Sequence, residues 1–236
     1  MKNSVVCPNC NTPNPFYNSN CSNCRNYLRD KVHNLDLWPN ISMLIESPSK
    51  AFNKIIFAEH KNFILFLFLI IAIKHLINTR FISMLTLGSF NTTVELFYSY
   101  LIVTGVMLFY YVIFSFLYLK IGTSMNISLR LKDTLALIIY SQLPFVFGLV
   151  LLFTLELIIF GDYLFSINPS PFIIKTTLAY LFSGLEIFII LWSTFLLFMA
   201  LKTQTHQKIF SLISSIVFFM FFWLLIYFCS LLIFTI

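Results

Sequence analysis

Five long hydrophobic segments constrain this 236-residue chain more than any other feature. The clearest run covers residues 96–119 without a charged side chain, and residues 209–236 are equally uncharged. A spanning helix needs about 20 apolar residues to cross a hydrocarbon core of about 30 Å. Hydrophobic residues make up 59% of the chain and charged residues only 10%, which excludes an ordinary soluble domain. We therefore expect an integral membrane protein.

The other three hydrophobic segments carry polar side chains. They cover residues 62–78 with Lys74 and His75, 134–160 with Pro144 and Glu156, and 172–201 with Lys175 and Glu186. Counting all five as spans predicts an all-α polytopic membrane protein, with residues 62–236 forming a bundle of five transmembrane helices. The first segment is the shortest, and the alternative is that it only dips into the membrane.

Basic residues flank these segments unevenly. With a cytoplasmic N-terminus, the inner side holds Lys50, Lys54, Lys61, Lys120, Arg130, Lys132, Lys202 and Lys208, whereas the outer loops offer Arg80 and Lys175. This bias predicts a cytoplasmic N-terminus and an outer C-terminus. The Phe-, Ile- and Asn-rich composition fits a prokaryotic origin, so we expect the membrane to be a bacterial cytoplasmic membrane. No apolar stretch precedes the first segment, so we expect no secretory signal peptide.

Residues 1–30 carry the pattern C-x2-C-x10-C-x2-C through Cys7, Cys10, Cys21 and Cys24. Two CxxC turns can place four thiolates around one divalent cation, usually zinc. So short and polar a stretch cannot fold without help, and the metal would supply it. Because all four ligand positions are cysteines, we expect a closed, structural zinc ribbon.

Two disulfides or a redox CxxC motif are the alternatives for these cysteines. Disulfides are rare on the cytoplasmic side, and a redox motif needs a βαβ context that the sequence lacks. Asn11 tolerates the left-handed backbone that such a turn requires, whereas Arg25 predicts a less regular second turn. Phe16 and Tyr17 are expected to pack over the metal.

Residues 31–61 predict a linker followed by an interfacial amphipathic helix. Trp38 favours a membrane surface, and Ser47 with Pro48 is typical of a helix start. One helical face gathers the apolar residues Ala51, Phe52, Ile55 and Ile56. We expect this face to lie on the membrane, a plain surface helix being the alternative.

Charged side chains inside the spans are costly and usually face a partner or cavity. Counting helical rise places Lys74 and Glu156 about 6 Å apart in depth, which predicts a contact between them. Alternatively, Lys74 extends toward the outer interface. Glu186 is either a protonated, hydrogen-bonded carboxyl or a proton or cation site.

The stretch YSQLPF, residues 140–145, predicts a break in the third span. Pro144 cannot donate to the Tyr140 carbonyl, and Ser141 and Gln142 can satisfy the freed backbone groups. A packing kink and a ligand site are both consistent with this motif.

No grouping of reactive side chains predicts an enzyme, and the four histidines show no ligand spacing. The net charge of +6 includes no basic run, so no nucleic-acid partner is expected. Cys229, in the last span, is expected to be a small buried hydrophobic residue.

The order of ESPSKAF, ALIIYSQLP and Trp192 across five spans resembles the Yip (Rab- or Ypt-interacting protein) membrane domain over residues 45–236. An N-terminal zinc ribbon is similar to prokaryotic members. Eukaryotic members act in ER-to-Golgi trafficking and bind prenylated Rab GTPases through cytosolic segments. This chain has a ribbon in place of their long N-terminal region, so that role does not transfer directly.

The resemblance implies a non-enzymatic scaffold that organises membrane or recruits a cytoplasmic protein through the ribbon. The alternative is a small transporter or channel that uses Lys74, Gln142 and Glu186. The bilayer is the expected surrounding, and association into homo-oligomers is left open.

Overall fold

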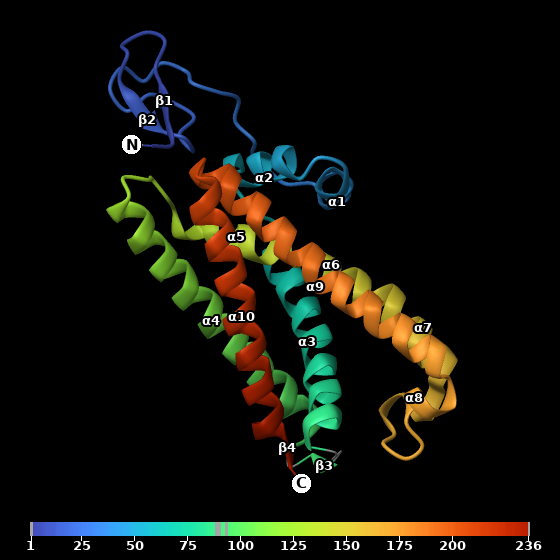
Figure 1. The fold of residues 1–236 in the computed structure, drawn as a ribbon. Helices are drawn as coiled ribbons and strands as arrows, with labels where there is room; N and C mark the ends of the chain where they lie inside the picture. The colour runs from blue at the N-terminus through green and yellow to red at the C-terminus, as the bar shows by residue number, and fades with distance from the viewer. Residues whose placement is uncertain (1, 88–90, 93, 236) are drawn as a thin grey trace. The chain divides into compact units, whose positions relative to one another are not determined.

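The computed structural model describes residues 2–87, 91–92 and 94–235, and most of them are helical (Figure 1). Five helical segments are long and apolar enough to cross a membrane: Ile64–Met84, Leu96–Ser124, Leu131–Phe165, Thr176–Thr205 and Lys208–Ile233. The helical membrane class is therefore confirmed, and the first segment is long enough to span. The chain divides into two compact units.

The first unit comprises Met1–Leu65, Tyr111–Ser141 and Phe195–Val217. It begins with an antiparallel hairpin of β1 (Ser4–Val6) and β2 (Pro13–Pro15), in which Val5 lies opposite Asn14. The helices α1 (Leu37–Glu46), α2 (Pro48–Phe57) and α5 (Leu131–Ser141) belong to the same unit. A single parallel bridge between Val32 and Ala58 joins the linker to the end of α2.

Helix α2 begins at Pro48, as predicted, because a proline in the first turn has no N–H to leave unpaired. Its apolar residues Ala51, Phe52, Ile55 and Ile56 are buried, and the helix packs against α1 and α5. The predicted contact of this face with the membrane is therefore wrong, because protein covers it. Trp38, on the neighbouring α1, stays 78% exposed.

The second unit comprises Phe66–Tyr110, Gln142–Thr194 and Phe218–Ile236. It holds most of α3 (Ile64–Leu87), together with α6 (Leu143–Phe147), the π-helix η1 (Gly148–Phe153), α7 (Thr154–Phe160), the 3₁₀-helix η2 (Gly161–Phe165), α8 (Pro171–Ile174) and the paired strands β3 (Asn91–Thr92) and β4 (Phe234–Thr235). The long helices α4 (Leu96–Ser124), α9 (Thr176–Thr205) and α10 (Lys208–Ile233) contribute residues to both units.

The third hydrophobic segment is not one continuous α-helix. Helix α5 ends at Ser141, Gln142 has φ −91° and ψ 10°, and α6 begins at Leu143 with Pro144 in its first turn. The predicted break before Pro144 is confirmed, because proline removes the hydrogen bond that would continue the helix. Ser141 Oγ donates to the Ile138 carbonyl at 2.7 Å. The π-helical stretch after α6 was not predicted.

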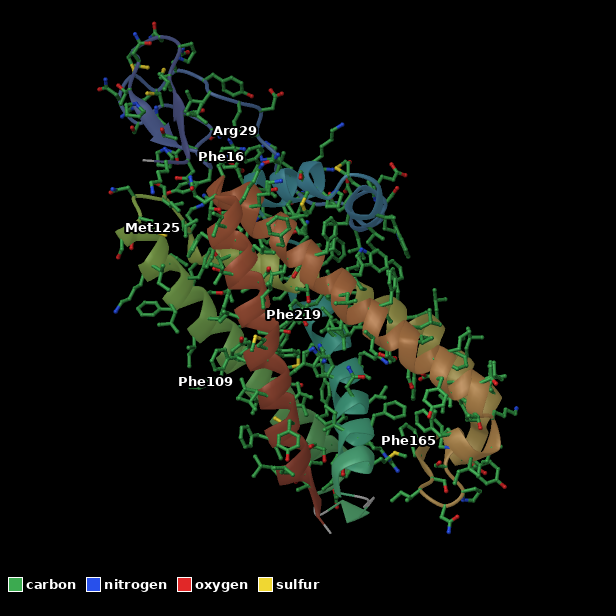
Figure 2. The ribbon with its side chains drawn as sticks, in the orientation of Figure 1. Phe16, Arg29, Phe109, Met125, Phe165 and Phe219 are labelled. Carbon is green, nitrogen blue, oxygen red and sulfur yellow. The ribbon has the colours of Figure 1, made fainter. Side chains whose placement is uncertain are left out.

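Large apolar side chains remain exposed along the spanning helices. Phe109 on α4, labelled in Figure 2, is 69% exposed, and Ile158 on α7 and Met220 on α10 are similarly open. Surfaces of this kind suit a hydrocarbon surrounding, since in water they would drive association.

Candidate metal centre and buried polar clusters

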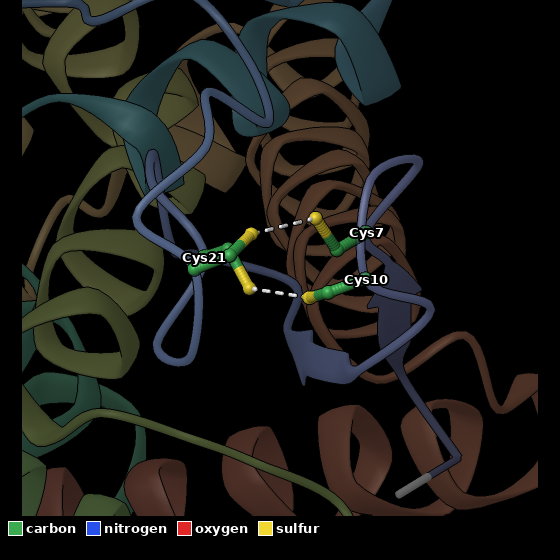
Figure 3. A group of neighbouring side chains, drawn as sticks. Cys7, Cys10 and Cys21 are labelled. Carbon is green, nitrogen blue, oxygen red and sulfur yellow. Dashed lines mark hydrogen bonds between the residues drawn. The ribbon is translucent and has the colours of Figure 1, made fainter.

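Four cysteine sulfurs converge beside the N-terminal hairpin. The Sγ atoms of Cys7, Cys10, Cys21 and Cys24 lie within 4.8 Å of one another. Figure 3 shows the side chains of Cys7, Cys10 and Cys21 pointing toward one another. The Cys7–Cys24 and Cys10–Cys21 sulfurs are 3.6 Å and 3.5 Å apart. A disulfide needs about 2.05 Å, whereas four sulfurs about 2.3 Å from one zinc lie roughly 3.8 Å apart. The spacing therefore fits a tetrahedral metal site.

The two CxxC turns share one backbone geometry. Asn11 and Arg25, which follow the second cysteine of each turn, have φ of 55° and 58°. Their backbone N–H groups donate to the carbonyls of Cys7 and Cys21 at 3.0 Å and 3.1 Å. The prediction that Arg25 makes the second turn less regular is wrong, because Arg25 adopts the same left-handed conformation as Asn11.

Asn14, on β2, supports the cluster and was not predicted. Its side chain is fully buried, and Nδ2 donates to Cys21 Sγ at 3.4 Å and to the Thr12 carbonyl at 2.8 Å. Its Oδ1 accepts hydrogen bonds from Ser22 N and Ser22 Oγ at 2.8 Å and 2.9 Å. One amide thus joins both cysteine turns and orients a sulfur, as outer-shell groups do around metals.

The thiols differ in their ease of ionisation. Hydrogen bonding with the side chain and backbone of Thr12 lowers the pKa of Cys10 to about 6. For Cys24, the hydrogen bond from the Asn26 backbone, which lowers its pKa, is outweighed by burial and by the other cysteines, and the pKa rises to about 11. Four thiolates packed this closely require a cation among them, so the donor set fits a divalent metal.

Two aromatic residues of the ribbon, which we define as residues 2–30, face the helices rather than the metal. The Phe16 ring centroid lies 5.1 Å from that of Phe57 and 4.8 Å from that of His206. The Tyr17 ring lies 4.1 Å beneath the Arg130 guanidinium. The prediction that Phe16 and Tyr17 cover the metal is wrong; they form the face by which the ribbon docks.

Asn3 secures the same docking through backbone groups of distant segments. It is buried, its Nδ2 donates to the carbonyls of Ser128 and Gln204 at 2.9 Å and 3.1 Å, and its Oδ1 accepts from Ser128 N at 2.8 Å. Arg29 adds a cation–π contact, 3.6 Å from the Phe57 ring centroid, and Figure 2 labels it beside Phe16. The ribbon is therefore part of the first unit and not a freely hanging knob.

A buried ion pair in the second unit joins α3 to α9. Lys74 Nζ lies 2.5 Å from Glu186 Oε1; the Lys74 side chain is fully buried and that of Glu186 is 23% exposed. The prediction that Lys74 contacts Glu156 is wrong, because the Lys74 ammonium group pairs with Glu186 instead. Helical rise gives the depth of a residue but not its direction around the helix.

Glu156 and Glu186 both line a cavity of about 600 Å³ in the second unit. Its walls are mostly apolar, with Phe160, Phe182 and Trp223 among them. The Glu156 side chain is buried, and its Oε2 has no hydrogen-bond partner among the described residues. Gln142 is not among the residues that line this cavity. Its Oε1 lies 3.2 Å from His75 Nε2, and both side chains are buried.

His75 was predicted to carry no site, and the structure gives it a packing role. Its ring lies 4.6 Å from that of Phe145 and 4.7 Å from that of Phe222, measured between centroids. Gln142, two residues before Pro144, therefore connects the break in the third segment to α3. Cys229 is 2% exposed, as its apolar surroundings predicted.

A second buried ion pair lies in the first unit and was missed. Lys61 Nζ is 2.9 Å from Asp133 Oδ1, and both side chains are at most 2% exposed. Burial lowers the pKa of Lys61, and Asp133 opposes that shift. Arg130 Nε also pairs with Asp133 at 2.7 Å. From the sequence, Lys61 counts among the basic residues of the inner side, because the residues around Lys61 do not indicate a partner as distant in sequence as Asp133.

The four cysteine sulfurs and the docking face of the ribbon lie in the first unit, and the Lys74–Glu186 pair lies in the second. Comparisons with family models, with curated proteins and with solved structures find no match for this chain.

Proposed function

We propose that this protein is a non-enzymatic membrane scaffold of the Yip type, whose zinc ribbon recruits a cytoplasmic protein or organises membrane. The observation that carries the proposal is the closed cluster of Cys7, Cys10, Cys21 and Cys24, fixed to the helices through Asn3 and Phe16. A site with four protein ligands has no open position for substrate, so its metal would stabilise structure.

The arrangement supports recruitment because docking uses one side of the ribbon and leaves the other open. Asn3 is buried, whereas the turn residues Pro8, Asn9 and Asn26 are exposed. A partner would therefore meet the tips of the cysteine turns. The break at Pro144, in the motif YSQLP, is also consistent with the Yip resemblance.

Crosslinking and pull-down from native membranes would test recruitment. Asn9→Arg adds a cation to an exposed turn tip, and Asn34→Arg adds the same charge to the exposed linker as a control. We expect the first variant to lose captured partners and the second to retain them, with metal content unchanged in both. Equal capture by both variants and by a four-cysteine-to-serine variant would refute a recruiting role for the ribbon.

A second candidate, a small transporter or channel, is favoured by one observation. The Lys74–Glu186 pair adjoins a 600 Å³ cavity that also receives the buried Glu156 carboxyl. Intramembrane charges beside a cavity are typical of ion and proton pathways. Proteoliposomes with a pH-sensitive dye inside would show a flux that Glu186→Gln abolishes; a flux that is absent, or indifferent to this change, would exclude proton movement.

A further inference from the structure

A polar cavity of about 180 Å³ lies in the first unit, apart from the metal centre. Its wall is formed by three segments distant in sequence: residues 17–31 of the ribbon and the start of the linker, residues 57–59 at and just after the end of α2, and residues 130–133 at the start of α5. These segments are held together by the contacts of Arg29 with Phe57 and of Arg130 with Tyr17. The cavity is thus a built feature of the docked ribbon.

Cations outnumber carboxylates in this wall. It contains the four basic residues Arg29, Lys31, Arg130 and Lys132 and the two acidic residues Glu59 and Asp133.

Both carboxylates already have cationic partners. Asp133 is paired with Arg130 and also with Lys61, which stands outside the wall. Glu59 lies 3.7 Å from Lys31 Nζ and 3.0 Å from His33 Nδ1. The positive charge that remains belongs mainly to Arg29 and Lys132.

Lys132 and Arg29 are bonded to neutral groups. Lys132 Nζ donates to the Glu59 carbonyl at 2.6 Å, and neither cation forms an ion pair among the described residues. Burial, together with the charge of Arg130, lowers the pKa of Arg29 to about 10. The cavity therefore concentrates positive charge without a matching anion.

The Arg29 guanidinium is held in place with one nitrogen unused. Nε donates to the Asn18 carbonyl at 2.9 Å, Nη2 donates to the Tyr17 carbonyl, and the Phe57 ring supports the guanidinium plane. Nη1 is buried and has no hydrogen-bond partner among the described residues. A buried donor on a charged group is costly to leave unpaired, so a ligand that brings an acceptor to this nitrogen would remove that cost.

We propose that this cavity binds a phosphate group, either on a lipid headgroup or on a soluble molecule. Guanidinium and ammonium groups together are the usual phosphate ligands in proteins, the first by its planar fork and the second as a point charge. Arg29 supplies the fixed fork and Lys132 supplies a point charge. Lys31, whose pair with Glu59 is 3.7 Å long and about half exposed, supplies a second point charge. The cavity has room for a phosphate group with part of its hydration.

Equilibrium dialysis of the purified full chain in maltoside detergent against radiolabelled inorganic phosphate tests the proposal. We expect saturable binding of one phosphate per chain. Lys31→Gln with Lys132→Gln should weaken it by about tenfold or more, because two charge-assisted contacts are lost. Arg29→Lys keeps the charge and removes the fork, and should weaken binding by an intermediate factor.

The matched control is Lys50→Gln with Lys54→Gln, which removes the same charge from α2 outside the cavity wall. It should bind phosphate within about twofold of the parent, since neither lysine lines the cavity and both keep contact with solvent, which screens their charges. Unchanged metal content and unfolding temperature would show that each variant is folded. Absence of saturable binding, or equal weakening by the two double variants, would overturn the proposal.

Competition separates the two sources of phosphate. A lipid headgroup is identified if short-chain phosphatidic acid displaces the labelled phosphate at concentrations at which unlabelled inorganic phosphate displaces little of it. Short-chain diacylglycerol should displace none. A soluble ligand is identified if glycerol phosphate displaces the labelled phosphate at concentrations no higher than those that phosphatidic acid requires. Either result supports the site, whereas displacement by diacylglycerol would show that the label follows the acyl chains and would refute it.

Discussion

Asn14 Nδ2 donates to Cys21 Sγ at 3.4 Å, and the Asn14 side chain is fully buried between the two cysteine turns. All of the side chain's polar atoms are engaged, with Thr12, Ser22 and the sulfur as partners. The ribbon therefore depends on one neutral amide as well as on its four ligands.

Asn14→Leu should destabilise the ribbon by about 2–3 kcal/mol, because Ser22 and Thr12 lose a buried partner. The measurement is the rate of metal release to a colorimetric chelator, which we expect to rise. Asn9→Leu, on the exposed turn tip, should release metal at the parent rate. A rate unaffected by Asn14→Leu would show that the amide has no supporting role.

Removing the metal should unfold residues 2–30 and leave the membrane helices intact, because a stretch so short and polar cannot fold alone. Hydrogen exchange should show lost protection near Cys7 and Cys21, with the far-ultraviolet helical signal retained. Cys7→Ser should reduce the metal content, whereas Cys229→Ser, in the last span, should keep it. A helical signal that collapses on chelation would contradict the separation of the two parts.

Phe57→Ala should loosen the docking of the ribbon without releasing its metal. Phe57 packs against both Phe16 and Arg29, so its loss removes the centre of the docking face. We expect a cost of about 2–4 kcal/mol, measured as faster proteolysis of the linker at residues 31–36. Tyr27→Ala, which removes an aromatic ring 52% exposed on the ribbon, serves as the control and should be cut at the parent rate.

Lys74→Met should destabilise the membrane helices by about 3–5 kcal/mol, because it leaves the Glu186 carboxylate without its cation. The double variant Lys74→Met with Glu186→Leu should recover much of this loss, since two apolar residues replace the pair. Thermal unfolding in detergent is the measurement. Lys120→Met, at the exposed end of α4, should have little effect, and strictly additive losses in the double variant would contradict the pairing.

The structural features that the sequence predicted correctly are those that depend on local patterns of residues. The cysteine spacing specified a four-sulfur cluster, the apolar runs specified five spanning segments, and Pro144 specified the break in the third. Each of these features is determined by residues close together in the chain, where periodicity and turn chemistry act directly.

Apart from the turn geometry at Arg25, which is a local feature, the errors concern partners distant in sequence. Lys74 was assigned to Glu156, although Glu186 is its partner, and the apolar face of α2 was assigned to lipid, although α1 and α5 cover it. Hydrophobic and charged groups require burial or a counter-charge, but their local sequence does not specify what supplies it. The docking of Phe16 on Phe57 and His206 was unpredictable for the same reason.

The hydrogen bonds of Asn3 have a consequence for biosynthesis. Its acceptors and donor lie 125 and 201 positions further along the chain, at Ser128 and Gln204. Asn3 is translated before both of these partners. The docking side of the ribbon therefore stays uncovered until four of the five spans have been synthesised. The four-cysteine hairpin is thus synthesised well before the segments that hold its docking side in place.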